Sequence, residues 1–282
     1  ILSKDADITA CFEVRLPELF TVASAEYEAI HSAWHKAIKT LPDFTIIHKQ
    51  DWYIKESYAP DLAIEDQSFL AKSYQRHFNE RPFLNHYCYL FLTKTTKERM
   101  RLQSNFSSLC KGSIIPKEIR NKETIHRFME AVAQFERIVN DSGFITLQRL
   151  TEDDIIGTDV KQGLLEQYLT LSREAGTPMQ DIALGTEEVR IGNKRLSLHT
   201  LSDTDDLPGT VSADTRFEKL STDRSDCRLS FAAPVGLLLS CNHIYNQYLF
   251  LDNSEANLQK FEKSARNMHS LARYSRANQI NK

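Results

Sequence analysis

The chain has 282 residues, of which 41% are hydrophobic and 26% are charged, and its formal net charge is −3. This composition indicates a folded protein with enough apolar mass for a core, and it excludes a generally basic nucleic-acid-binding protein. The five cysteines include no CxxC pair, so we expect a reducing compartment and no disulfide framework. No run of about 18 apolar residues is present, so we expect no segment that spans a membrane alone.

The first part of the chain alternates predicted strands and helices. Residues 8–16 alternate between apolar and polar, which predicts a half-buried strand, and helical spacing follows in residues 24–41 until Pro42. Further strands are predicted at 44–54 and 83–92. The second of these is apolar on both faces and is expected in the centre of its sheet. A helix is predicted between them at 65–79, with four residues facing inward: Phe69, Leu70, Tyr74 and Phe78.

The clearest helical pattern lies between Asn121, a predicted N-cap, and Gly143, a predicted end. Its apolar residues recur at helical spacing throughout: Ile125, Phe128, Met129, Val132, Phe135, Ile138 and Val139. Residues 143–185 are rich in glycine and acidic residues, and we expect a loose connector there with a short helix near 160–171.

The last third of the chain predicts a second series of elements. A hairpin turns at Gly192-Asn193, and a helix is predicted near 213–221. Residues 229–239 predict a buried strand that is interrupted at Pro234–Gly236. Residues 242–251 predict the next strand. Residues 254–276 predict a final helix, with an inner stripe of five residues: Leu258, Phe261, Ala265, Met268 and Ala272.

These elements predict an α+β protein made of two sequential α+β units, in each of which helices cover a sheet. We expect the first unit over residues 1–143, a helical and glycine-containing connector over 144–186, and the second unit over 187–282.

Several clusters of residues are candidate sites. His31 and His35 have the i,i+4 spacing of metal ligands, but the glutamate of an HExxH motif is absent, which favours two ordinary histidines. Soft metal ligands could come from Cys227, Cys241, His243 and His199, although their spacings match no common zinc pattern and a buried thiol with a hydrogen-bonded histidine is favoured. Three acidic residues resemble the start of a calcium loop, but the glycine and final glutamate of that loop are missing and a solvated acidic turn is favoured: Asp203, Asp205 and Asp206.

No GxSxG, GxGxxG or GxxxxGK[ST] motif is present, so the chain has no recognisable loop for a nucleotide phosphate. We therefore expect no catalytic residue, no cofactor-binding residue and no metal ligand in this chain. Its charge is distributed unevenly, with basic segments at 94–122 and 260–282 and an acidic one at 151–188. Such blocks are either solvated faces or contacts for a lipid surface, a nucleic acid or another protein.

Four blocks carry a resemblance to a known family: residues 77–118, 128–144, 221–253 and 272–282. Together they resemble the N-terminal region of the TraG family, conjugation ATPases of Bacteroides-type conjugative transposons that are similar to the VirB-family ATPases of type IV secretion. The resemblance extends over essentially the whole chain. It implies a cytoplasmic protein at the inner membrane that forms a homo-oligomer and uses ATP, with Mg²⁺, in a C-terminal motor domain.

None of the motor motifs has a counterpart in this sequence, so the resemblance implies a truncated N-terminal piece that is not itself an enzyme. The implied role is an assembly or docking domain that positions the motor on the other conjugation proteins of the transfer channel. The alternative is a DNA-contacting module that uses the basic segments 94–122 and 260–282.

Overall fold

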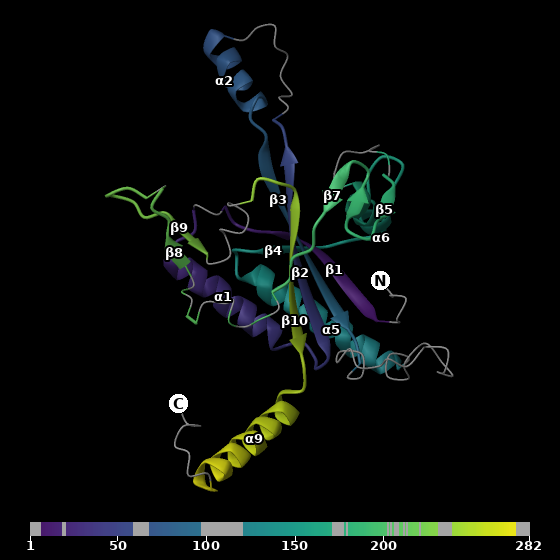
Figure 1. Cartoon of the computed structure of the whole chain (residues 1–282), viewed down its shortest axis with the longest axis vertical. Helices are drawn as coiled ribbons and strands as arrows, with labels where there is room; N and C mark the ends of the chain where they lie inside the picture. Colours follow the sequence, from purple (N-terminus) through teal and green to yellow (C-terminus); the bar gives the residue numbers. More distant parts are fainter. Residues whose placement is uncertain are drawn as a thin grey trace.

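A computed structural model gives the fold of the chain (Figure 1). It describes residues 7–18, 21–58, 68–96, 121–170, 178, 180–201, 203, 205, 209–210, 212, 214–219, 221–230 and 239–274. Helices and antiparallel strands alternate along the chain, which confirms the predicted α+β class. The interrupted strand predicted at 229–239 falls largely outside the described residues, which include only its first two residues and its last.

One sheet of five antiparallel strands forms the centre of the molecule, in the order β10-β2-β3-β1-β4. Its strands are β1 (Ile8–Arg15), β2 (Thr45–Glu56), β3 (Phe83–Lys94), β4 (Thr146–Arg149) and β10 (His243–Leu251). The order β2-β3-β1-β4, with α1 (Ser24–Ile38) after β1 and α5 (Lys122–Asp141) before β4, is that of a split βαβ, or ferredoxin-like, arrangement. The prediction of a central strand at 83–92 is confirmed by the position of β3.

The two helices cover one face of this sheet and form the main core with it. Trp34 of α1 meets Phe135 of α5 edge to face, with ring centroids 5.5 Å apart. The α5 stripe is confirmed, because four of its residues are at most 1% exposed: Phe128, Val132, Phe135 and Val139. The Asn121 side chain accepts a hydrogen bond from Glu123 N, and Gly143 has a φ of 75°, so both predicted ends of this helix are also confirmed.

The opposite face carries a smaller core, in which Trp52 and Tyr89 pack with Leu164. Leu164 begins α7 (Leu164–Thr170), which follows α6 (Glu152–Ile156). The predicted short helix near 160–171 is therefore confirmed. Tyr168 of α7 stacks edge to face on Trp52 at 4.7 Å and donates a hydrogen bond to Gln50.

β10 corrects the prediction that residues 187–282 form a second unit with a sheet of its own. It pairs with β2 over all nine of its residues, from His243 opposite Tyr53 to Leu251 opposite Thr45. The physical reason lies in β2, whose Ile47 and Trp52 point to opposite faces and are each 1% exposed. The backbone of such a strand is buried between its side chains, so its N–H and C=O groups must be paired, and β10 pairs those on the edge that β3 leaves open.

Two small sheets complete the described strands. One consists of β5 (Ile182–Leu184), β6 (Val189–Ile191) and β7 (Lys194–Leu196), and the predicted turn lies between the last two, where Gly192 has a φ of 58°. The other pairs β8 (Asp214–Arg216) with β9 (Arg228–Ser230). The prediction of a helix near 213–221 is therefore wrong.

Two further helices project from opposite ends of the main sheet (Figure 1): α2 (Phe69–Asn79), between β2 and β3, and α9 (Ser254–Tyr274), after β10. Both helices were predicted, but their apolar stripes were expected to face a core. Phe69 is instead 82% exposed and Phe261 is 72% exposed. Helical periodicity correctly identified the apolar residues of each stripe, but it does not show whether another part of the protein covers them.

Candidate interaction site

The histidine and cysteine candidates do not assemble into a metal site. No group of three or more His, Cys, Asp or Glu residues in the described part of the chain could hold a metal ion. His31 and His35 lie on the exposed side of α1, and His199 lies in an exposed segment after β7. Cys241 is exposed and Cys227 is half-buried, and both are free thiols.

His243 is held by a backbone carbonyl and by ring stacking. Its Nδ1 donates to Cys241 O at 2.8 Å, so Nε2 is left as an acceptor. Nε2 is buried and has no hydrogen-bond partner among the described residues. The ring stacks on Tyr53 at 4.6 Å, and Tyr53 stacks on His86 at 4.7 Å, so three directly opposed residues of β10, β2 and β3 form one ladder.

Beside this ladder lies a buried carboxylate, Asp51, whose side chain is 6% exposed. It accepts hydrogen bonds from His86 Nε2 at 2.9 Å and from Lys49 Nζ. Burial alone would raise the pKa of Asp51, but the hydrogen bonds from His86 and Lys49 and the charge of Lys49 outweigh burial, so the pKa is lowered. One carboxylate thus stays ionised and joins the side chains of two strands.

The neighbouring groups are not prepared for covalent chemistry. Burial raises the pKa of the Cys88 thiol to about 12, and burial together with the charge of Asp51 raises the pKa of Tyr53 to about 12. A buried thiol with a raised pKa is a poor nucleophile, because the thiolate is the reactive form. The hydrogen bonds and stacked rings of the cluster link neighbouring strands of the main sheet.

An apolar groove of about 660 Å³ opens between α1 and the β10 side of the main sheet. Its walls include Ile30 and Trp34 of α1 and Leu249 of β10, and Lys49 also lines it. Leu249 is 45% exposed, although it lies on the face of the sheet that α1 and α5 cover. The floor of the groove comes from this face of the sheet, at Val14 of β1, Ile47 of β2 and Leu90 of β3.

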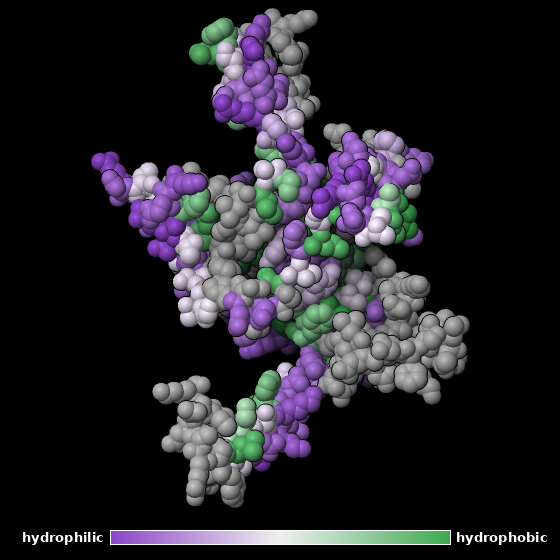
Figure 2. All heavy atoms as spheres, in the orientation of Figure 1, coloured by the Kyte–Doolittle hydropathy of each residue, from purple (hydrophilic) through white to green (hydrophobic). Residues whose placement is uncertain are grey.

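The apolar side chains of α2 are exposed at one end of the molecule, where Figure 2 shows hydrophobic (green) atoms at the tip of a mostly hydrophilic helix. Leu70 is 77% exposed and Tyr74 is 67% exposed. The rings of Tyr74 and Phe78 lie against each other, and Phe78 also contacts the ring of Tyr58, which follows β2. The α9 stripe is exposed at the opposite end of the molecule, with three large side chains 59–72% exposed: Leu258, Phe261 and Met268.

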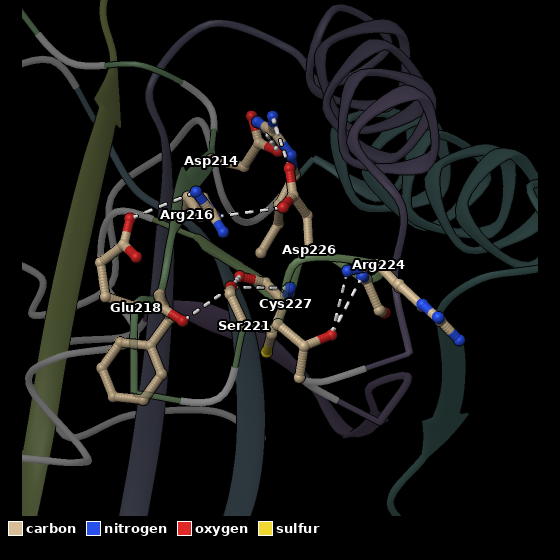
Figure 3. A network of polar contacts seen from close by, with 11 residues as sticks. Asp214, Arg216, Glu218, Ser221, Arg224, Asp226 and Cys227 are labelled. Atoms are coloured by element: carbon tan, nitrogen blue, oxygen red, sulfur yellow. Dashed lines mark hydrogen bonds and ion pairs between the residues drawn. The ribbon is translucent and has the colours of Figure 1, made fainter.

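The β8-β9 ribbon carries a network of charged side chains (Figure 3). Arg216 pairs with Asp226 at 3.1 Å and with Glu218 at 3.7 Å, and Arg228 pairs with Asp214 at 3.3 Å. Ser221 Oγ donates to Phe217 O and accepts from Cys227 N, which closes the loop between the strands. These local bonds explain why the segment forms a ribbon and not the predicted helix.

The acidic loop candidate contains a local turn in the described residues. Asp205 N donates to Asp203 Oδ1 at 3.1 Å, which is the hydrogen bond of an Asx turn, while Asp206 lies outside the described residues. Of the basic segment 94–122, residues 97–120 also lie outside the described residues. The part of 260–282 that is described contributes Lys260, Lys263 and Arg266, all exposed on α9.

Sequence reasoning missed the groove and the Asp51 cluster. A signal for the cluster existed, since Lys49 and Asp51 are two apart in a predicted strand and must share a face. The groove had no such signal, because its walls come from segments more than 200 residues apart that meet only when β10 pairs with β2.

Comparisons with known proteins add one partial match. The first 32 residues match a family model described as a domain of unknown function, B. Theta Gene description (DUF3875). No curated protein matches the chain. The matched segment contains β1 and the first part of α1, including the groove residues Ile30 and His31.

Proposed function

We propose that this chain is the assembly and docking domain of a conjugative-transfer ATPase of the type IV secretion class. The four blocks that resemble the TraG family support the class. The observation that carries the docking role is the exposed apolar stripe of α2, which stands away from both cores at the end of the β2-β3 hairpin (Figure 1). Contiguous exposed apolar side chains at such a position are typical of protein–protein contacts.

The proposed role requires no chemistry from this chain. We propose no catalytic, cofactor-binding or metal-ligating residue here, and we expect ATP and Mg²⁺ to bind in a separate motor domain of the longer protein. None of the described helices is both long and apolar enough to cross a bilayer. Association with the cytoplasmic face of the inner membrane is part of the proposal and rests on the resemblance alone.

The docking role can be tested with a photocrosslinking residue at position 70 in cells that carry the conjugative element. We expect crosslinks from Leu70, 77% exposed on α2, to another protein of the transfer channel. The matched control is Gln134, exposed on the solvent side of α5, where no such crosslink is expected. A Leu70→Asp variant should lower transfer frequency at unchanged protein level. No specific crosslink and unchanged transfer would refute the docking role.

A DNA-contacting role is the second candidate, since Lys260, Lys263 and Arg266 are exposed along α9. Against it, Arg266 pairs with Glu262 at 3.8 Å, which reduces the local positive charge. Binding driven by phosphate contacts must weaken steeply as salt concentration rises. Titration of labelled single- and double-stranded DNA at low and physiological salt decides the matter, and no binding at low salt removes this candidate.

A further inference from the structure

Helix α9 stands away from the main sheet and carries an apolar stripe that nothing covers among the described residues. The stripe consists of Leu258, Phe261, Ala265 and Met268, all of which are exposed. We propose that α9 lies flat on an anionic lipid surface, with this stripe among the acyl chains and its basic residues at the headgroups. The inference deepens the membrane association of the proposed function, rests on it for the location of the lipid, and names the element that makes the contact.

The charge of the chain is distributed as binding to an anionic surface requires. Residues 260–282 contain six Lys and Arg residues and one acidic residue, a net charge of +5. The whole chain has a net charge of −3, so the other 259 residues together carry −8. An anionic surface therefore attracts this segment and repels the rest of the chain. Clusters of four to eight Lys and Arg residues on an amphipathic helix are typical of binding to anionic lipids.

The basic residues of α9 are placed on both flanks of the stripe. At about 100° per residue, the four stripe residues lie within a sector of about 80°, and no charged residue of α9 falls inside this sector. Lys260 and Arg266 lie about 120° from the centre of the sector on opposite sides of the helix, and Lys263 lies opposite the stripe. Both flanks can therefore reach lipid headgroups while the stripe points into the membrane, as in interfacial helices.

The combination of stripe and charge favours a lipid surface over DNA. Contacts to DNA phosphates use basic side chains and leave an apolar stripe exposed to water. A lipid surface buries the stripe and neutralises the basic residues in one contact. Both signals are needed, because three large apolar side chains give only weak insertion and charge attraction alone is screened by salt.

The first turn of α9 is fixed so that the helix points away from the sheet (Figure 1). Asn253 Oδ1 accepts a hydrogen bond from Ala256 N at 2.7 Å, which caps this turn. Asn253 Nδ2 donates to Asp43 Oδ2 at 2.6 Å, which ties the cap to the segment before β2. These two bonds set the direction in which α9 leaves the sheet, and they leave the stripe available to an external surface.

Flotation of the 282-residue chain with lipid vesicles tests the role of charge. At low salt, vesicles of equal parts phosphatidylcholine and phosphatidylglycerol should bind the chain at least tenfold more tightly than phosphatidylcholine alone. Replacing all three bases, Lys260→Gln, Lys263→Gln and Arg266→Gln, should lower the affinity at least tenfold, because each contributes about fivefold near an anionic surface. Glu262→Gln should raise the affinity several-fold, since Glu262 pairs with Arg266 at 3.8 Å.

The matched control for charge is a triple variant on α5, a packed helix of almost the same length. Lys122→Gln, Arg127→Gln and Arg137→Gln remove three exposed bases from α5 and should change the affinity for anionic vesicles less than twofold. An equal loss in the α5 and α9 triple variants would overturn the proposal, because binding would then depend on the overall charge of the chain and not on α9.

The apolar stripe is tested separately. Phe261→Glu should lower the affinity at least tenfold and leave the circular dichroism unchanged, since Phe261 is 72% exposed in the free chain. Leu198→Glu, at a residue 85% exposed after β7, is the control and should bind as wild type does. The fluorescence of Phe261→Trp should shift to the blue on anionic vesicles. That of Asn267→Trp, on the polar side of α9, should not shift.

Three outcomes would overturn the proposal besides the failed control. They are no binding of wild type to anionic vesicles at low salt, binding that survives Phe261→Glu, and an affinity for DNA that exceeds the affinity for vesicles and is lost only in the α9 triple variant. The last outcome would support the DNA-contacting role. None of these measurements needs another protein of the transfer channel, and crosslinking from Leu70 on α2 does not depend on α9, so failure here is distinguishable from failure of the docking role.

Discussion

Helices α5 and α9 have almost the same length and the same kind of sequence pattern but opposite surroundings. Both carry apolar residues at three- and four-residue spacing over 20 and 21 residues. The stripe of α5 packs on α1 and the sheet and is at most 1% exposed at Phe128, Val132, Phe135 and Val139. The large side chains of the α9 stripe are more than half exposed. The comparison separates two properties, the formation of an amphipathic helix and the presence of a surface that covers it.

The largest expected effect comes from shortening one aromatic side chain in each helix. Phe135→Ala removes a fully buried ring that contacts Trp34, and it should lower the free energy of unfolding by about 3–5 kcal/mol. Phe261→Ala removes a ring that is 72% exposed, so it should change this value by less than about 0.5 kcal/mol. Urea denaturation measures both. Equal losses would contradict the distinction between the two helices.

The buried carboxylate of Asp51 gives the next largest effect. Asp51→Asn leaves Lys49 and His86 without their anionic partner and should lower the free energy of unfolding by about 1–3 kcal/mol at neutral pH. The folded-state pKa of Asp51 lies below its ordinary value of 3.8, so its contribution is complete above pH 3.8 and is lost as pH falls through the folded pKa.

Denaturation at several pH values checks this sign. The difference between wild type and Asp51→Asn should be constant from about pH 5 to 6 and should shrink below pH 3.8. A matched control is Asp153→Asn on α6, since Asp153 is exposed and accepts no side-chain hydrogen bond in the described part of the chain. A difference that grows on acidification would mean that burial, and not hydrogen bonding, dominates the pKa of Asp51.

Local patterns predicted most of the elements because their causes are local. The alternation in residues 8–16 became β1, and the apolar run at 83–92 became the central strand β3. The Asn121 cap and the Gly192-Asn193 turn depend on side-chain and backbone preferences of one or two residues, and both were correct.

The interaction site could not be predicted in the same way, because it depends on contacts between distant segments. Nothing in residues 242–251 indicates that this strand pairs with β2 and not with a neighbour in the last third of the chain. The helix near 213–221 failed for a related reason. The ion pairs that stabilise a ribbon in this segment, such as Arg216 with Asp226, form only when β8 and β9 pair.

The N-cap of α5 makes a smaller, polar contribution to the stability of this helix. Asn121→Ala removes the acceptor of the Glu123 amide hydrogen bond, which is 3.0 Å long, and should cost about 1 kcal/mol of unfolding free energy. Asn121→Asp keeps a hydrogen-bond acceptor at this position and should retain nearly all of this unfolding free energy. If the cap of a packed helix proved irrelevant, α5 would be held by its apolar stripe alone. Denaturation of the three proteins under one condition gives the answer.

The smallest effect is expected on α2, where Arg76 and Glu80 form an exposed i,i+4 pair at 2.8 Å. The hydrogen bond and charge of Arg76 lower the pKa of Glu80, but both side chains are more than 60% exposed, so water screens the interaction. Glu80→Gln should leave the denaturation curve unchanged within error. The matched control is Glu123→Gln, which removes the exposed ion pair between Glu123 and Arg127 on α5. A clear loss for Glu80→Gln alone would show that α2 is packed against another part of the molecule. In that case the apolar stripe of α2 would not be free for a partner protein, and α2 would be a packed helix like α5 and not an exposed helix like α9.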